Sequence, residues 1–375
     1  MSTITNFNDL QEVAINFRKD LTGDHRPEKD LILFFAHNGT GKTRLSMEFK
    51  ELGKTGGNRD TLYFNAFTED LFTWNNDLEN DTNRKLRING DSAFFDGLHE
   101  LDLNEKIESF FHNYVDIQFD IDYNSSTISF SRSVIIDGTE QRIENIKISR
   151  GEENLFRWCF FLAICQLVID KDPAYSWVKY IYIDDPVSSL DENKAIAVAC
   201  DLASLMKSAE DSDIKFVIST HHSLFFNVMY NEIGRKFKNK RYFLHSTLSK
   251  EYKLQDTSDT PFFHHIAMLA ELKQIVETNK IYTYHFNALR SILEKTATFF
   301  GYDKFDTCIE SIKEEDEVLF ERALQLFSHG KYSIFDPVEM GDDNKELFKR
   351  ILEAFFNKYE FHFPQIFNEE NPVTA

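Results

Sequence analysis

Cysteine is scarce in this sequence, with four in 375 residues, and their positions exclude most roles of this residue type. They have neither the short paired spacing of a zinc site nor that of a redox motif. Three of the four fall in apolar segments with helical character; the set is Cys159, Cys165, Cys200 and Cys308. We therefore expect buried, reduced thiols, which are typical of a cytoplasmic protein.

Long apolar runs and an excess of positive charge are also lacking. The longest strongly apolar stretch, residues 158–169, has about 12 residues and is too short to span a bilayer. The net charge of −20 argues against a non-specific nucleic-acid coat and against an anionic membrane surface. Basic clusters at residues 84–87 and 235–241 are compatible with solvated faces, and a local phosphate-binding surface is the alternative. We expect a cytoplasmic protein without membrane contact.

An apolar run at residues 31–35 is followed at once by a glycine-containing loop. This loop matches the G-x-x-x-x-G-K-[ST] pattern of nucleotide-binding P-loops, except that Ala36 takes the first glycine position. Lys42 is expected to reach the β- and γ-phosphates of ATP, GTP or dTTP, and Thr43 to hold Mg²⁺. A chance match in a loop is the alternative. The residues expected to bind nucleotide here are Asn38, Gly39, Thr40, Gly41, Lys42, Thr43 and Arg44.

Three further segments extend the nucleotide-binding pattern. An apolar strand at residues 180–183 ends in Asp184 and Asp185, where a Mg²⁺-orienting acid and a catalytic base are expected. A second buried strand at residues 216–220 is followed by His221. Upstream, a Ser-Arg-Gly-Glu-Glu segment at residues 149–153 precedes an apolar helix at residues 155–169.

In this order the motifs resemble those of the ATP-binding-cassette ATPases over about residues 15–230. The resemblance implies that Asp184 orders Mg²⁺, that Asp185 stands where the family usually has Glu, and that His221 contacts the γ-phosphate. It also implies a head-to-tail pair of chains, at least a dimer, in which signature and D-loop residues face the partner's nucleotide. Those residues are Ser149, Gly151, Glu152, Ser189 and Asp191. No clear Q-loop glutamine is present; residues 65–70 occupy its expected place.

The chain is long enough for two domains. We expect an α/β fold with a P-loop ATPase head of the cassette type and a mixed sheet at residues 1–250. An insertion at about residues 75–148 is expected to be helical up to residue 112 and to form strands from residue 115. A mainly α-helical C-terminal domain is expected at residues 251–375, with helices at residues 266–279, 282–300, 318–327 and 344–359.

A second constellation lies in the helical part. Arg290 and Glu294 are four residues apart and share one helix face, and His329 follows a later helix. By themselves these residues are compatible with a salt bridge and a structural histidine. Near them, residues 284–286 are aromatic and are interpreted as core, with stacking of an unpaired base as the alternative.

Several stretches resemble the anticodon nuclease PrrC family, in which a cassette ATPase is fused to a helical ribonuclease. They are residues 38–49 (NGTGKTRLSMEF), 64–78 (FNAFTEDLFTWNNDL), 183–190 (IDDPVSSL) and 284–302 (YHFNALRSILEKTATFFGY). The resemblance implies an endoribonuclease that cuts a tRNA in its anticodon loop with Arg290, Glu294 and His329. It also implies a conditional antiviral toxin that a type I restriction-modification complex keeps silent.

The chemistry of these side chains needs no metal at the nuclease site. Glu294 and His329 can serve as base and acid, and Arg290 can bind the phosphate oxygens. We expect 2′,3′-cyclic phosphate and 5′-hydroxyl ends. In the stretch corresponding to the family's lysine-tRNA recognition box, Lys253 and Asp256 are kept, while Asp259 replaces a basic residue.

Two other functions remain open from the sequence. In one, the chain is an ATPase sensor that holds and releases a separately encoded defence effector. In the other, it is a DNA-repair type of cassette ATPase, although the insertion is too short for a long coiled-coil arm.

Overall fold

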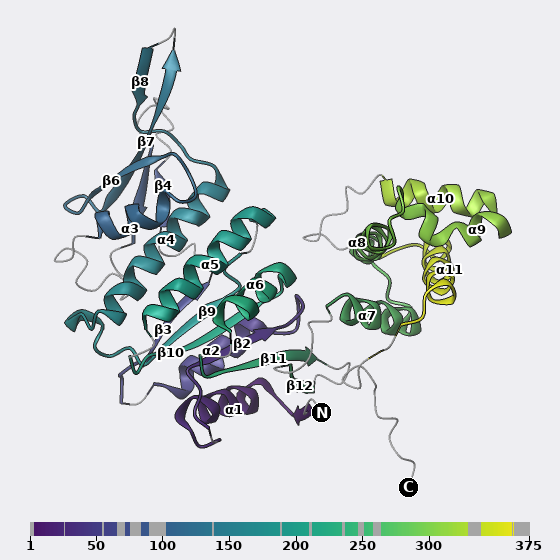
Figure 1. Cartoon of the computed structure of the whole chain (residues 1–375), viewed down its shortest axis with the longest axis horizontal. Helices are drawn as coiled ribbons and strands as arrows, with labels where there is room; N and C mark the ends of the chain where they lie inside the picture. Colours follow the sequence, from purple (N-terminus) through teal and green to yellow (C-terminus); the bar gives the residue numbers. More distant parts are fainter. Residues whose placement is uncertain are drawn as a thin grey trace. The chain divides into compact units, whose positions relative to one another are not determined.

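The computed structural model contains two compact units, Met1–Thr260 and Pro261–Ala375. It describes residues 4–25, 27–54, 56–65, 72–75, 84–89, 103–136, 139–187, 190–209, 212–234, 237–246, 251–257, 264–328, 339–361 and 363. The first unit is a mixed α/β structure with a parallel-rich sheet, and the second is helical (Figure 1). The predicted fold class is confirmed.

A seven-stranded sheet forms the centre of the first unit. The five consecutive strands from β11 to the edge strand β3 are parallel, and β12 runs antiparallel to its neighbours β1 and β11. The central strand β2 is apolar and buried throughout, as expected where helices cover both faces of a sheet. In spatial order the strands are β1 (Ile4–Phe7), β12 (Tyr252–Asp256), β11 (Asn239–Ser246), β2 (Leu31–Phe35), β10 (Lys215–Thr220), β9 (Tyr180–Asp184) and β3 (Thr61–Asn65).

Helices pack on both faces of this sheet. Helices α1 (Leu10–Thr22) and α2 (Lys42–Leu52) bury Phe17 and Phe49 in a cluster that includes Ile32 and Phe34 of β2. On the other face, α6 (Ser223–Ile233) contacts β2 and β10, and α5 (Glu192–Ser208) lies between α6 and α4 (Arg150–Ile169). Successive side chains of β2 point to opposite faces of the sheet, so they pack against different helices on each face.

A smaller sheet lies between the P-loop and α4 in the sequence. It consists of β4 (Phe72–Asn75), β5 (Lys85–Ile88), β7 (Thr127–Ile136) and β6 (Gln118–Asp122), with β8 (Thr139–Ile143) paired to the far half of β7. The expectation of helix for residues 75–112 is wrong at β5; α3 (Asn104–Phe111) agrees with it. Four-residue strands are too short to show a clear alternation of apolar and polar residues. The position of β4 depends instead on tertiary packing: the ring centres of Phe72 and of Phe160 in α4 are 5.5 Å apart.

The second unit is built from five α-helices among the described residues. They are α7 (His264–Thr278), α8 (Thr283–Phe300), α9 (Glu310–Glu315), α10 (Glu317–Ser328) and α11 (Asp342–Lys358). Short 3₁₀ segments are η5 (Phe305–Ile309) here and η4 (Pro173–Tyr175) in the first unit. The core of the second unit joins Phe286, Leu289 and Leu293 of α8 to Phe348 and Ile351 of α11.

The first unit ends at Thr260, whereas we expected the domain boundary after residue 250. The difference is due to strand β12. Its backbone pairs with β1 on one side and with β11 on the other. Since both partners belong to the large sheet, residues 252–256 are part of the first unit.

Candidate functional site

The predicted nucleotide-binding residues lie at the carboxyl ends of four adjacent strands. The P-loop connects β2 to α2, and the strand register aligns Phe35 with Thr220, Ser219 with Asp184, and Asp184 with Asn65. Ligands of open α/β sheets bind at this edge of the sheet. The topology thus brings together segments that are far apart in the sequence.

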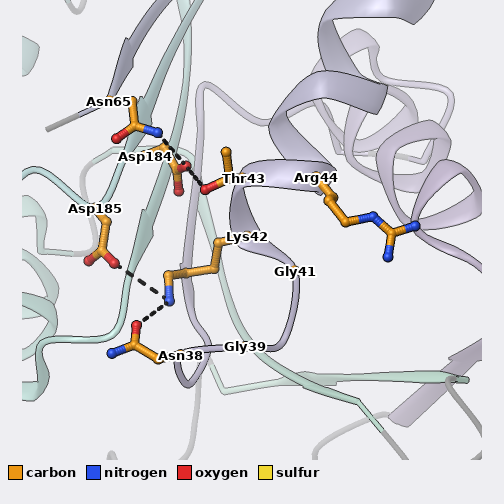
Figure 2. Close-up of a pocket in the computed structure, with 9 residues that line it drawn as sticks. All are labelled: Asn38, Gly39, Gly41, Lys42, Thr43, Arg44, Asn65, Asp184 and Asp185. Atoms are coloured by element: carbon orange, nitrogen blue, oxygen red, sulfur yellow. Dashed lines mark hydrogen bonds and ion pairs between the residues drawn. The ribbon is translucent and has the colours of Figure 1, made fainter. Parts of the chain in front are cut away.

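A cavity of about 260 Å³ lies at this edge (Figure 2). Gly39 and Gly41 adopt φ values of 84° and 102°, a left-handed region that lets backbone N–H groups turn inward. The side chain of Arg44 points away from Lys42 and the two aspartates (Figure 2). The cavity is lined by Asn38, Gly39, Gly41, Lys42, Thr43, Arg44, Asn65, Asp184 and Asp185.

Lys42 is buried at the base of the cavity, with 7% of the residue exposed. Its Nζ donates to the carbonyl oxygens of Ala36 at 3.1 Å and His37 at 3.3 Å, and to Asn38 Oδ1 at 3.3 Å. Burial lowers the pKa of Lys42, and the carboxylates of Asp185 and Asp184 offset part of this effect. The loop therefore holds a buried cation of the kind that phosphate binding requires.

Thr43 and Asp184 form the part of the site that fits Mg²⁺. Thr43 Oγ1 donates to Asp184 Oδ2 at 2.8 Å, and Ser219 Oγ donates to Asp184 Oδ1 at 2.5 Å. Burial raises the pKa of Asp184, and the hydrogen bonds from Ser219 and Thr43 counteract it. A hydroxyl and a carboxylate suit Mg²⁺, which usually takes one or two carboxylates together with substrate phosphates. Thr43 and Asp184 would hold the ion, which would neutralise charge on the nucleotide's phosphates.

Asp185 contacts His221, the residue that is expected to contact the γ-phosphate. Its φ of 56° is a strained value for a residue with a side chain. His221 lies with Nδ1 2.5 Å from Asp185 Oδ2, and its backbone N–H donates to Oδ1 at 3.2 Å. Burial alone would raise the pKa of Asp185, but the His221 hydrogen bonds and the charges of His221 and Lys42 lower it overall. Asp185 is thus held ionised, 3.5 Å from Lys42 Nζ.

Sequence reasoning missed Tyr63 and the position of Asn65 in this site. Tyr63 Oη donates to Asp184 Oδ2 at 3.4 Å, and Asn65 Nδ2 lies 3.1 Å from Tyr63 Oη and 3.5 Å from Asp184 Oδ2. Burial beside Asp184 raises the pKa of Tyr63 to about 12. The sequence feature that could have indicated Asn65 is its position at the beginning of residues 65–70, which take the expected place of the Q-loop.

The predicted signature residues lie at the beginning of α4. Ser149 and Glu152 form a reciprocal capping box, with bonds of 3.3 Å and 2.7 Å. Glu152 also pairs with Arg132 at 2.8 Å. A Cβ added at Gly151 would meet no atom within 4 Å. Asp191 caps α5 by accepting from Lys194 N at 3.0 Å, and Ser189 lies outside the described residues.

Arg290 and Glu294 are paired on the surface of α8. Arg290 Nε donates to Glu294 Oε1 at 2.7 Å, and the two side chains are 37% and 48% exposed. The Arg290 guanidinium also lies 5.6 Å from the centre of the Phe305 ring. His329 follows the last residue of α10 and lies outside the described residues. Helix α10 packs on α8.

Lys253 and Asp256 are the two candidates for substrate recognition, and both are in β12. They differ by three positions in a strand, so their side chains leave opposite faces of the sheet. Asp256 Oδ2 lies 3.8 Å from Lys240 Nζ, and Lys253 pairs with His245 in the strand register. The structure does not bring Lys253 and Asp256 together on one surface.

Comparison with known proteins gives a relative over most of the chain. The chain is 34% identical over 364 residues to a protein named "Anticodon nuclease" from Escherichia coli, covering 88% of this chain and 89% of the relative. The chain belongs to the anticodon nuclease family. The sequence model of a family described as "AAA domain" also matches residues 101–357. The head of this family member is therefore a nucleotide-binding ATPase domain.

The fold also has partial matches among solved structures. A crystal structure of the SmcHead bound to the C-winged helix domain of ScpA is 13% identical, with a TM-score of 0.27, and covers 41% of this chain and 42% of its own. At that score the overlap is too low to support a structural argument.

In the described part of the chain, no helix combines the length and apolar character needed to cross a bilayer.

Proposed function

We propose that this family member is a nucleotide-gated endoribonuclease that cuts a tRNA within its anticodon loop. The observation that carries the proposal is the exposed Arg290–Glu294 pair, 2.7 Å apart on α8, in a chain 34% identical to a protein named anticodon nuclease. Both side chains keep part of their surface in solvent, as residues that contact a large substrate must.

The proposed reaction is attack by a ribose 2′-hydroxyl on the adjoining phosphorus. The base removes the 2′-hydroxyl proton, the bond from phosphorus to the 5′-oxygen breaks, and the acid protonates that oxygen. Glu294 and His329 share the base and acid roles, and Arg290 stabilises the phosphate charge through its planar fork. The products are a 2′,3′-cyclic phosphate and a 5′-hydroxyl end. The three side chains are sufficient for this reaction without a metal at the nuclease site.

Nucleotide binding in the first unit is proposed to control the nuclease. In the proposed active form, two chains associate head to tail so that Ser149 and Gly151 of one face the P-loop of the other. The open space around Gly151 supports this arrangement, since a partner's nucleotide needs access to the beginning of α4. Dimers with two-fold symmetry, in which each chain presents the same surface to the other, are the commonest homo-oligomers.

The biological setting follows from the reaction. An enzyme that cuts tRNA harms its own cell, so we propose a cytoplasmic, conditional antiviral toxin held latent by a partner such as a type I restriction-modification complex. Lysine tRNA is one proposed substrate, recognised with a contribution from Lys253 and Asp256. The network of Lys42, Asp185 and His221 is the proposed sensor of the nucleotide's γ-phosphate.

The direct test is to sequence RNA ends in cells that express the chain or its His329→Ala variant. We expect one dominant tRNA fragment with a 5′-hydroxyl end in the first case and its loss in the second. If nucleotide-dependent release of another protein occurs without any tRNA fragment, the chain is a sensor for a separate effector instead.

A further inference from the structure

Helix α8 ends in two adjacent exposed aromatic side chains. Phe299 is 84% exposed and Phe300 is 51% exposed. The other large apolar side chains that are exposed in the described part of the chain are aliphatic or methionine. Because an exposed ring gives up the stabilisation that burial would supply, folding of the second unit does not account for a phenylalanine at position 299.

The two rings belong to a cluster with defined geometry. Phe300 stacks nearly parallel to Tyr302, with ring centres 5.9 Å apart and planes at 19°, and lies 5.1 Å from the ring of Tyr359. Phe299 meets Phe300 edge-on, at 5.4 Å and 85°. Because Phe299 is 84% exposed, this contact leaves most of its ring surface open to solvent.

The end of α8 fixes this cluster. Gly301 adopts φ of 73°, and Tyr302 N donates to the carbonyl of Ala297 at 2.8 Å. This is a helix C-terminal cap with glycine in the left-handed region. It folds Tyr302 back toward Phe300, so the ring that supports Phe300 does not depend on a loose loop.

A cation adjoins the rings. Lys358, the last residue of α11, has its Nζ 5.6 Å from the ring centre of Tyr302 and 5.8 Å from that of Tyr359. The same Nζ donates to the carbonyl of Thr307 at 2.5 Å, which fixes the ammonium beside the cluster. Lys358 therefore adjoins Tyr302 and Tyr359, which contact Phe300, and Phe300 contacts Phe299. A cation in the same cluster as an exposed ring suits a nucleotide, which has both a base and a phosphate.

We propose that Phe299 is a stacking platform for an unpaired base of the RNA substrate, with Lys358 toward an adjoining phosphate. The inference rests on the proposed function and adds a substrate-positioning residue to it. RNA-binding sites stack splayed-out loop bases on aromatic rings. Two aromatic candidates nearer Arg290 do not serve, because His285 is 2% exposed and Phe286 is 1% exposed.

The spacing along α8 suits a single RNA loop. Phe299 lies nine positions after Arg290, which is an axial rise of about 14 Å at about 1.5 Å per residue. This rise equals about four stacked nucleotides at roughly 3.4 Å each, which is the minimum length of strand between the two side chains. At about 100° per residue Phe299 lies opposite Arg290 around the helix axis. A strand therefore reaches it over the C-terminal end of α8, where the Gly301 cap turns the chain aside.

The test measures RNA binding by the full chain carrying Glu294→Gln, which prevents cleavage during the measurement. Two labelled RNAs are compared by fluorescence anisotropy: an anticodon stem–loop and a blunt duplex without unpaired bases. Phe299→Ala is expected to weaken stem–loop binding roughly 5- to 160-fold and to leave duplex binding unchanged. Phe299→Trp is expected to keep the affinity for the stem–loop. The fluorescence of the added tryptophan is expected to be quenched when the stem–loop binds.

The matched control is Val318→Ala, which removes an 80% exposed apolar side chain from the same unit and is expected to bind like the parent. Equal loss in Val318→Ala, or parent-like stem–loop binding by Phe299→Ala, overturns the platform. Loss of self-association in sedimentation without loss of RNA affinity overturns it as well, and assigns the rings to an interface between copies.

Cleavage assays separate this inference from the proposed function. If the native chain cuts tRNA and Phe299→Ala cuts it with the same kcat/KM, only the platform fails. If the native chain cuts no tRNA but Phe299→Trp is quenched by stem–loop RNA, the RNA platform stands and the proposed cleavage activity fails.

Discussion

The hydroxyl of Thr43 donates a 2.8 Å hydrogen bond to the carboxylate of Asp184, although 141 positions separate the two residues. Thr43 is fixed by the beginning of α2, and Asp184 by the end of β9. Strand β10 lies between β9 and β2, so the contact depends on correct pairing of three strands. The contact between Thr43 and Asp184 therefore forms only when these three strands have paired.

Removing the buried cation of the P-loop tests nucleotide control. Lys42→Ala is expected to reduce nucleotide binding at least tenfold and to abolish nucleotide-dependent tRNA cleavage, because it removes the charge that contacts the γ-phosphate. Calorimetric titration with nucleotide measures the first effect and a cleavage assay the second. Lys54→Ala, at an exposed lysine just after the same helix, is the control. Cleavage that persists at full rate in Lys42→Ala shows that the head is not a switch.

The ionised state of Asp185 predicts its role in hydrolysis. Asp185→Asn keeps an oxygen that can accept from the backbone of His221 but removes the charge. We expect nucleotide hydrolysis to fall roughly 10²- to 10⁴-fold, the range for loss of a general base, while nucleotide still binds. Phosphate release and binding are measured side by side. Asp172→Asn changes the cap of a short 3₁₀ segment outside the cavity and should preserve hydrolysis; equal losses in both variants contradict the assignment.

The beginning of α4 offers a test of head-to-tail assembly. Gly151→Asp introduces a side chain into open space, and a carboxylate in the first turn of a helix is electrostatically favourable. The variant is therefore expected to fold as well as the native chain. Its negative charge should repel a partner's γ-phosphate and abolish nucleotide-dependent association, as measured by sedimentation. Unchanged association with nucleotide would show that this surface does not face a second chain.

Much of the architecture was predictable from periodicity. The four helices expected in the second unit correspond to α7, α8, α10 and α11 within a few residues, because each has a continuous apolar stripe facing the core. Strands β4 and β5 were not predictable, since four residues carry little pattern. The assignment of β12 to the first unit also depends on long-range pairing with β1.

The candidate sites were predictable to different degrees. Lys42 and Thr43 come from a local motif whose function depends on backbone conformation within a few residues. Tyr63 and Asn65 reach Asp184 only because β3 lies beside β9 in the sheet. No spacing rule in one sequence indicates that contact. The opposite faces of Lys253 and Asp256 likewise became evident only when the strand was assigned.

His285 predicts that the second unit is sensitive to acid. Burial lowers the pKa of His285 to about 4, and its Nδ1 accepts from Tyr282 N at 2.9 Å. Well above pH 6.5, its ordinary pKa, the residue is neutral in both folded and unfolded chains. As pH falls from 6.5 to about 4, the unfolded chain binds a proton that the folded chain does not. The free energy of unfolding should therefore decrease, by about 3 kcal/mol at most.

Thermal unfolding of the full chain between pH 7 and 4 measures this effect. His285→Gln keeps an acceptor suited to this capping position but cannot titrate, so its unfolding midpoint should depend less on pH than that of the native chain. The exposed residue His112 provides the control variant His112→Gln. Identical slopes for the native chain and His285→Gln would assign the acid sensitivity to other groups.

The three nuclease candidates are expected to act as a unit. Arg290→Ala, Glu294→Ala and His329→Ala should each remove most tRNA cleavage and leave nucleotide hydrolysis intact, because base, acid and phosphate clamp are needed in the same step. The double variant of Arg290 and Glu294 should then be little worse than either single one. A surface ion pair at i,i+4 contributes only about 0.3–0.5 kcal/mol, so loss of the pair alone should barely change the unfolding midpoint.

His329 distinguishes this site from a simple salt bridge. A structural Arg290–Glu294 pair would make cleavage indifferent to His329, whereas the proposed chemistry needs a second proton-transfer group. Arg322→Ala, at an exposed arginine of α10, controls for general loss of positive charge in the second unit. Rates are measured on one labelled tRNA with nucleotide present, together with the chemical nature of both new ends. Cleavage by His329→Ala at the native rate, or loss of cleavage in Arg322→Ala equal to that in Arg290→Ala, contradicts the assignment.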